Sequence, residues 1–91
     1  MPTIAHLRRL AKLLPGAVVY TRAECIRQGH PFDPPCAYLS VTDASGKTAK
    51  VCVDGEAYLS QGDARETVFR VDITKPRLAA QQVRFGPEDP A

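Results

Sequence analysis

The first fourteen residues have the hydrophobic spacing of an amphipathic helix. Thr3 can cap a helix that runs to about Leu14, where Pro15-Gly16 would end it, because proline cannot continue the hydrogen-bond ladder. At about 100° per residue, the apolar side chains share one arc roughly half the circumference wide. This arc holds Ile4, Leu7, Leu10, Ala11, Leu13 and Leu14, with His6 among them. The opposite side carries Arg8, Arg9 and Lys12.

The apolar arc is wider than a single packing contact requires. A stripe of roughly 100° covers one surface, so we expect this helix to cover its own sheet and a second surface. A second copy of the chain would supply that surface most simply, and we predict a homodimer or partner contact through Leu10, Leu13 and Leu14. His6 is expected at the edge of the core, donating to a backbone carbonyl.

Residues 17–28 predict a short strand followed by a short helix. The run Ala17-Val18-Val19-Tyr20 is β-branched and typical of a strand. Thr21 and Glu24 have the spacing of a capping box, which predicts a helix from Arg22 to Gln28 with Gly29 as its stop. Residues 29–35 are expected to form a loop, because their three prolines remove three backbone donors.

From Cys36 onwards the chain alternates apolar and polar residues, as half-buried strands do. Residues 36–42 and 49–53 predict a β-hairpin, with turn residues at 43–46. Asp54-Gly55 predicts a second turn, which adds residues 56–60 as a third strand. A two-residue turn there would place Val51 opposite Tyr58 and Cys52 opposite Ala57.

The C-terminal third begins with the cleanest alternation in the chain. Residues 67–73 predict the longest strand of the sheet, which Pro76 would end. Residues 77–85 fit either a short helix or an edge strand, and the pattern does not decide between them. Residues 1–86 are expected to form a single domain, and residues 87–91 a frayed tail.

This order of elements predicts an α+β fold. We expect a two-layer domain with an N-terminal helix packed on a mainly antiparallel sheet of four or five strands. The length of 91 residues and the hydrophobic fraction of 44% are those of one globular domain with a thin core.

Charge is concentrated in the first helix. The formal net charge is only +2, but residues 1–14 carry three basic residues and no acidic one, which leaves nine basic against ten acidic residues elsewhere. The absence of a long apolar run or signal pattern predicts a soluble cytoplasmic protein with no membrane contact. Arginine outnumbers lysine eight to four, a usage common in GC-rich bacterial genomes, and a chain of this size suggests a phage or plasmid gene.

The three cysteines do not form a recognisable framework. Their odd number and irregular spacing favour reduced thiols. Cys25, His30, Cys36 and Cys52 are the right residue types for a tetrahedral zinc site. The gaps of four, five and fifteen residues lack the usual tight knuckle, so buried thiols are favoured, and neither a metal nor a cofactor is expected. Whether the four residues come together is left open.

Catalytic patterns are weak in this chain. A nucleophilic cysteine needs a base beside it, and only His6 and His30 are available as imidazole bases. The glycines are scattered singly and form no phosphate-binding loop. We therefore expect no enzymatic activity.

Two binding functions remain. The first is a small module, such as a regulator, adaptor or inhibitor, that occupies a protein surface through Arg8, Arg9 and Lys12 or through a free strand edge. The alternative is nucleic-acid binding as a dimer, with these cations on phosphates and outward-facing aromatic residues stacking on bases. The aromatic candidates are Tyr20, Tyr38, Tyr58 and Phe69. The first function is favoured, because no helix-turn-helix pair is visible in the sequence.

Overall fold

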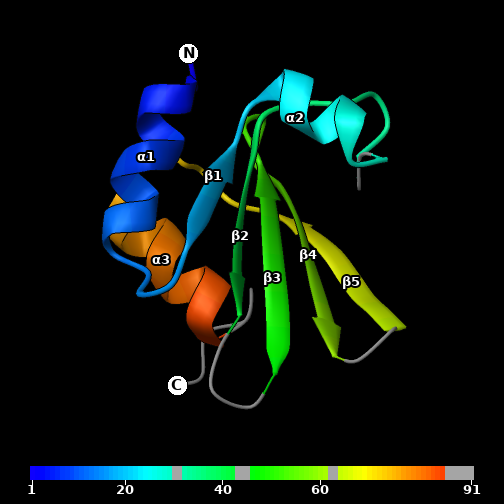
Figure 1. The fold of residues 1–91 in the computed structure, drawn as a ribbon. Coiled ribbons are helices and arrows are strands. Elements are labelled where there is room, and N and C mark those ends of the chain that lie inside the picture. Colours follow the sequence, from blue (N-terminus) through cyan, green and yellow to red (C-terminus); the bar gives the residue numbers. More distant parts are fainter. Residues whose placement is uncertain (30–31, 43–45, 62–63, 86–91) are drawn as a thin grey trace.

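The computed structural model in Figure 1 describes residues 1–29, 32–42, 46–61 and 64–85. Its elements are α1 (Ile4–Lys12), β1 (Val18–Tyr20), α2 (Arg22–Arg27), β2 (Tyr38–Thr42), β3 (Lys47–Cys52), β4 (Glu56–Gln61), β5 (Ala64–Arg70) and α3 (Pro76–Phe85). The predictions for residues 30–31 of the loop, 43–45 of the first turn and 87–91 of the tail lie outside the described residues.

The five strands form one antiparallel sheet in the order β1-β2-β3-β4-β5. Every strand therefore pairs with the strands next to it in the chain, as consecutive elements commonly do. Figure 1 shows α1 and α3 together on one side of this sheet. The predicted α+β fold, with an N-terminal helix and a mainly antiparallel sheet, is confirmed, and α3 adds a second helix to the helical layer.

The first hairpin forms as predicted, and in it Leu39 lies opposite Val51. The second hairpin forms, but its predicted register is wrong by one residue, because Val51 lies opposite Ala57. Gly55 has a φ of +98°, and its backbone nitrogen donates to the carbonyl oxygen of Cys52 at 2.8 Å. Glycine adopts this left-handed conformation readily, which allows a three-residue turn in place of the two-residue turn we predicted.

The last predicted strand is displaced along the chain. It was expected at residues 67–73, whereas β5 ends at Arg70. Beyond this end, Val71 and Ile73 remain buried in the core. The side chain of Asp72 then accepts a hydrogen bond from the backbone nitrogen of Thr74 at 3.0 Å, which turns the chain towards α3.

Residues 77–85 are helical. Pro76 is the first residue of α3, a position that proline favours because the first turn of a helix needs no donor there. Ala79, Ala80 and Val83 of α3 are buried, and their spacing fits one helical face.

The larger core lies between the sheet and these two helices. Its members include Leu7, Leu10, Leu14, Leu39, Val51, Ala57, Phe69, Ile73, Ala79 and Val83. Helix α1 contacts β1, β2 and α3. The second surface covered by the wide apolar arc of α1 is therefore α3 of the same chain, so a second copy is not needed to bury it.

His6 contributes to the start of α1 in a way we did not predict. Its Nδ1 accepts a hydrogen bond from the backbone nitrogen of Thr3 at 2.9 Å and lies 3.1 Å from the Thr3 hydroxyl oxygen. The half-buried imidazole thus takes the place that glutamate holds in an ordinary capping box, and the expected bond to a carbonyl is not its interaction here.

A smaller core lies apart from the helical layer. Helix α2 and the segment that follows it contribute Cys25 and Phe32, which are buried with Tyr38 and Cys52 of the sheet. Tyr38 lies directly opposite Cys52 in the β2–β3 ladder. Within the described ranges, no helix is both long and apolar enough to cross a bilayer.

Candidate binding surface

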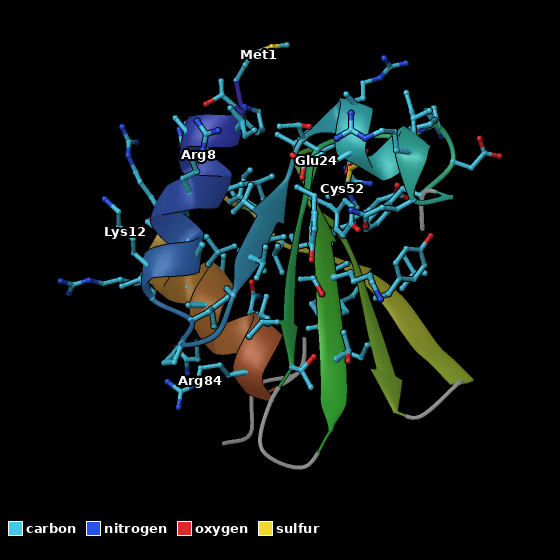
Figure 2. The ribbon with its side chains drawn as sticks, in the orientation of Figure 1. Met1, Arg8, Lys12, Glu24, Cys52 and Arg84 are labelled. Atoms are coloured by element: carbon cyan, nitrogen blue, oxygen red, sulfur yellow. A yellow bond between two sulfur atoms is a disulfide. The ribbon has the colours of Figure 1, made fainter. Side chains whose placement is uncertain are left out.

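The three predicted cations of α1 are exposed. Leu7 and Leu10 are buried against the sheet and α3, and this fixes the rotation of the helix. Arg8, Arg9 and Lys12 therefore lie on its outer side, as the helical pattern requires. Figure 2 shows Arg8 and Lys12 on the side of α1 that faces away from the sheet.

Helix α3 adds two cations that the sequence analysis did not include. Arg77 and Arg84 are both exposed, and Figure 2 places Arg84 on the same side of the molecule as Arg8 and Lys12. The sequence feature that could have found them is Pro76, because proline at the start of a 3.6-residue apolar pattern indicates the beginning of a helix. A helix there places Arg77 and Arg84 on a second basic element. We call the residues Arg8, Arg9, Lys12, Arg77 and Arg84 the basic helical surface.

Charge differs between the two helices α1 and α3 and the rest of the chain. Helices α1 and α3 carry five of the twelve basic residues and no acidic residue, which leaves seven basic against ten acidic residues in the rest of the chain. Because α1 and α3 are in contact, these positive charges add to one another over a short distance. A surface of this kind attracts an anionic partner and orients it during approach.

Two of the three leucines predicted to form a dimer or partner contact are buried within the single chain. Leu10 and Leu14 are 0% and 2% exposed within the single chain, so they cannot contribute to a dimer or partner contact. The cause is α3, which covers the part of α1 that the sequence left without a neighbour. Leu13 is 41% exposed and borders the basic helical surface, and Leu78 on α3 is 48% exposed.

The aromatic residues proposed for base stacking are mostly covered. Phe69 is buried in the larger core beneath the helices. Tyr38 is buried between two other rings, stacked on Tyr20 at 5.0 Å between ring centroids and tilted against Phe32 at 5.7 Å. Tyr58 also meets Phe32, at 5.0 Å. Tyr38 thus belongs to the smaller core, and Tyr20 and Tyr58 pack half-buried against that core.

The cysteines do not remain three separate thiols. Cys36 and Cys52 form a disulfide whose Cα atoms are 6.1 Å apart, within the normal range for this bond. The expectation of three reduced thiols is therefore wrong for this pair, while Cys25 is free and buried. No group of three metal-ligating side chains occurs among the described residues, and His30 lies outside them.

The two carboxylates with shifted pKa values belong to a helix cap and to a turn. Hydrogen bonds from Thr21 lower the pKa of Glu24 at the start of α2. Hydrogen bonds from Thr74 lower the pKa of Asp72 before α3. Both shifts reflect donors that stabilise the ionised carboxylate. Glu24 caps α2, and Asp72 belongs to the turn that precedes α3.

No protein-family model, curated protein or solved structure matches the chain.

Proposed function

We propose that this protein is a small non-enzymatic binding module that acts by occupying an acidic protein surface with its basic helical surface. The observation that carries the proposal is the charge of the two helices, with five basic and no acidic residues on α1 and α3. Four of these five residues are arginines, whose planar guanidinium groups can bind carboxylates through two parallel hydrogen bonds. A regulator, an adaptor and an inhibitor would all use such a surface.

The experiment is a pull-down from the cell of origin with a matched pair of charge-reversed baits. Arg8→Glu with Lys12→Glu alters the basic helical surface. Arg22→Glu with Arg27→Glu makes the same change in net charge on exposed residues of α2. The expected result is a protein that binds the natural chain and the α2 variant, is lost with the α1 variant, and is unaffected by nuclease.

The α2 variant separates a local effect from a general effect of net charge. Circular dichroism of both variants confirms that they are folded before the comparison is made. A partner that binds all three baits equally would contradict the proposed surface. A lysate in which no protein depends on Arg8 and Lys12 would contradict the proposed function.

Nucleic-acid binding is a second candidate, favoured by the two cations that α3 adds to the three on α1. Contacts to five phosphates would give a slope of about −4.5 when the logarithm of affinity is plotted against that of salt concentration. Titration of a labelled random duplex at roughly 50 and 200 mM salt would detect it. A flat titration contradicts this candidate. Because α1 packs beside α3, a contact with the phosphate backbone fits better than insertion into a groove.

A homodimer remains a prediction that analytical ultracentrifugation can test. Its contact would have to use exposed residues, because Leu10 and Leu14 belong to the core of one chain. A dimer would double the number of cations presented to a partner. A dimer that dissociates on Leu13→Ala would place Leu13 at the contact.

A further inference from the structure

The face of the sheet that points away from α1 and α3 carries a continuous row of residues, one from each strand. The strand registers place these five residues side by side: Val18, Ser40, Lys50, Tyr58 and Val68. The neighbouring row, which contains Leu39 and Val51, faces the larger core. Because successive residues of a strand point to opposite faces, the first row lies on the other face. We call its five residues the open row.

The open row is only partly covered. Val18 and Val68, at its two ends, are 49% and 46% exposed, and the three residues between them are half-buried. The smaller core covers the same face around Cys52, and Figure 1 shows α2 at that end of the sheet only. On the other side of the open row, the same face carries Thr42 and Thr48, whose hydroxyl oxygen atoms are 3.1 Å apart.

Lys50 is the one charge in the open row. It lies on β3, the middle strand of the five, with Ser40 and Tyr58 directly opposite it on the neighbouring strands. Farther along the same face, Arg70 lies opposite Glu56 in the ladder of β4 and β5, so those two charges offset each other. In the part of the chain that the structure describes, Lys50 itself has no hydrogen bond or ion pair. A half-buried ammonium group between hydroxyl-bearing side chains suits an anion such as a phosphate group.

The contents of the open row discriminate between possible occupants. A second copy of the chain, bound about a two-fold axis through this row, would bring two Lys50 ammonium groups together, and like charges at close range are destabilising. Peptides bind sheets at an edge strand or bind apolar grooves as helices. A single nucleic-acid strand can instead lie across a sheet face, with phosphates on cations and bases against aromatic and apolar side chains. Five strands span about 19 Å, which leaves room for about three bases.

We propose that the open row binds a single strand of nucleic acid, with a phosphate group on Lys50 and bases packed against Tyr58 and Val68. Charge complementarity at Lys50 supports this occupant. The basic helical surface lies on the other side of the sheet, so the open row is a separate site. Its occupation does not depend on the function proposed for the helices.

The direct test is to map the bound strand by NMR spectroscopy. The isotope-labelled natural chain is titrated with an oligothymidylate of about ten nucleotides, a length in the range that single-strand-binding domains cover, at roughly 50 mM salt. An oligouridylate of equal length covers RNA. The amide resonances of Ser40, Lys50 and Tyr58 should shift, and those of Arg8 and Lys12 should not. Shifts confined to α1 and α3, or no shifts with either oligonucleotide, would overturn the proposal.

Two lysine variants separate the open row from the basic helical surface. Lys50→Ala and Lys12→Ala make the same change in net charge on opposite sides of the sheet. Fluorescence anisotropy measures the affinity for the same oligonucleotide over a range of salt concentrations. Loss of one phosphate contact in Lys50→Ala should reduce the slope of log affinity against log salt by about 0.7, whereas Lys12→Ala should keep the slope of the natural chain.

Lys50→Arg keeps the charge and should bind like the natural chain. A duplex of the same length should bind more weakly than the single strand, because its bases are stacked and paired. An equal loss in the two alanine variants, or tighter binding of the duplex, would assign the binding to the helices and overturn the proposal. Circular dichroism checks that the variants fold, and if Lys50→Ala does not fold, the mapping on the natural chain decides.

Discussion

Gly55 and Val71 are in direct backbone contact. The nitrogen of Val71 donates to the carbonyl oxygen of Gly55 at 2.8 Å, and a Cβ atom on Gly55 would overlap the carbonyl oxygen of Val71. This contact joins the turn between β3 and β4 to the segment that leads from β5 to α3. Glycine is required there for two separate reasons, because its φ is also +98°.

Replacement of Gly55 by alanine should lower the free energy of unfolding by about 3 kcal/mol or more. The left-handed conformation accounts for about 1–2 kcal/mol of this loss, and the overlap with the Val71 backbone accounts for the rest. Gly16→Ala is the matched control, because Gly16 has a φ of +81° but no atom within 4 Å of an added Cβ. Urea unfolding of both variants measures the difference, and equal losses would contradict the role of Val71.

Leu7 anchors α1 in the core and is 0% exposed. Leu7→Ala should cost about 2–5 kcal/mol, because the cavity would lie between the sheet and the helical layer. Leu13→Ala, on the exposed side of the same helix, should cost less than about 1 kcal/mol. Thermal or urea unfolding measures both values. A loss below about 1 kcal/mol for Leu7→Ala would mean that α1 does not pack on the sheet.

The sequence predicted correctly those elements that are determined by residues close together in the chain. The capping box of Thr21 and Glu24 requires only four consecutive residues, and the structure contains it with the predicted hydrogen bonds. The alternation at Leu39 and Val51 fixed the faces of the first hairpin, since a one-residue shift would turn apolar side chains away from the core. The cations of α1 followed from helical geometry in the same way.

The features that the sequence missed depend on contacts between distant segments. Helix α3 buries the small residues Ala79 and Ala80, which give little hydrophobic signal, so its pattern fitted a strand as well. Without α3, nothing indicated that Leu10 and Leu14 were already covered. The disulfide between Cys36 and Cys52 forms because the hairpin register brings the two residues together. The spacing of the cysteines along the sequence does not reveal that register.

Thr21 stabilises α2 through both halves of its capping box. Its hydroxyl accepts a hydrogen bond from the backbone nitrogen of Glu24 at 3.2 Å, and the Glu24 carboxylate accepts one from the backbone nitrogen of Thr21 at 3.2 Å. Thr21→Ala should lower the free energy of unfolding by about 0.5–2 kcal/mol. Thr21→Ser keeps the hydroxyl and should restore most of the loss in urea unfolding.

The same box predicts a dependence on acidic pH. The pKa of Glu24 is lowered in the folded protein, mainly by its hydrogen bonds with Thr21, so the unfolded chain binds this proton more tightly. The stabilisation is fully present above the ordinary pKa of glutamate and is lost as the pH falls through the lowered pKa. Glu24→Gln should remove this part of the pH dependence. An unchanged acid transition in the Glu24→Gln variant would contradict the contribution of the carboxylate.

Tyr38 should make the protein less stable at alkaline pH. Its hydroxyl donates to Gln28 Oε1 at 3.3 Å, and burial, followed by the charges of Tyr20, Cys25 and Glu24, raises its pKa. The folded state therefore holds this proton more tightly than the unfolded chain. The stabilisation is present below the ordinary tyrosine pKa of about 10 and is lost as the pH rises through the raised value.

The Tyr38→Phe variant tests this contribution. At neutral pH the variant should be less stable by about 0.5–1.5 kcal/mol, because it lacks the hydrogen bond. When urea unfolding is repeated at alkaline pH, the variant should lose less stability than the natural chain. Parallel losses in the two proteins would show that Tyr38 does not cause the alkaline effect.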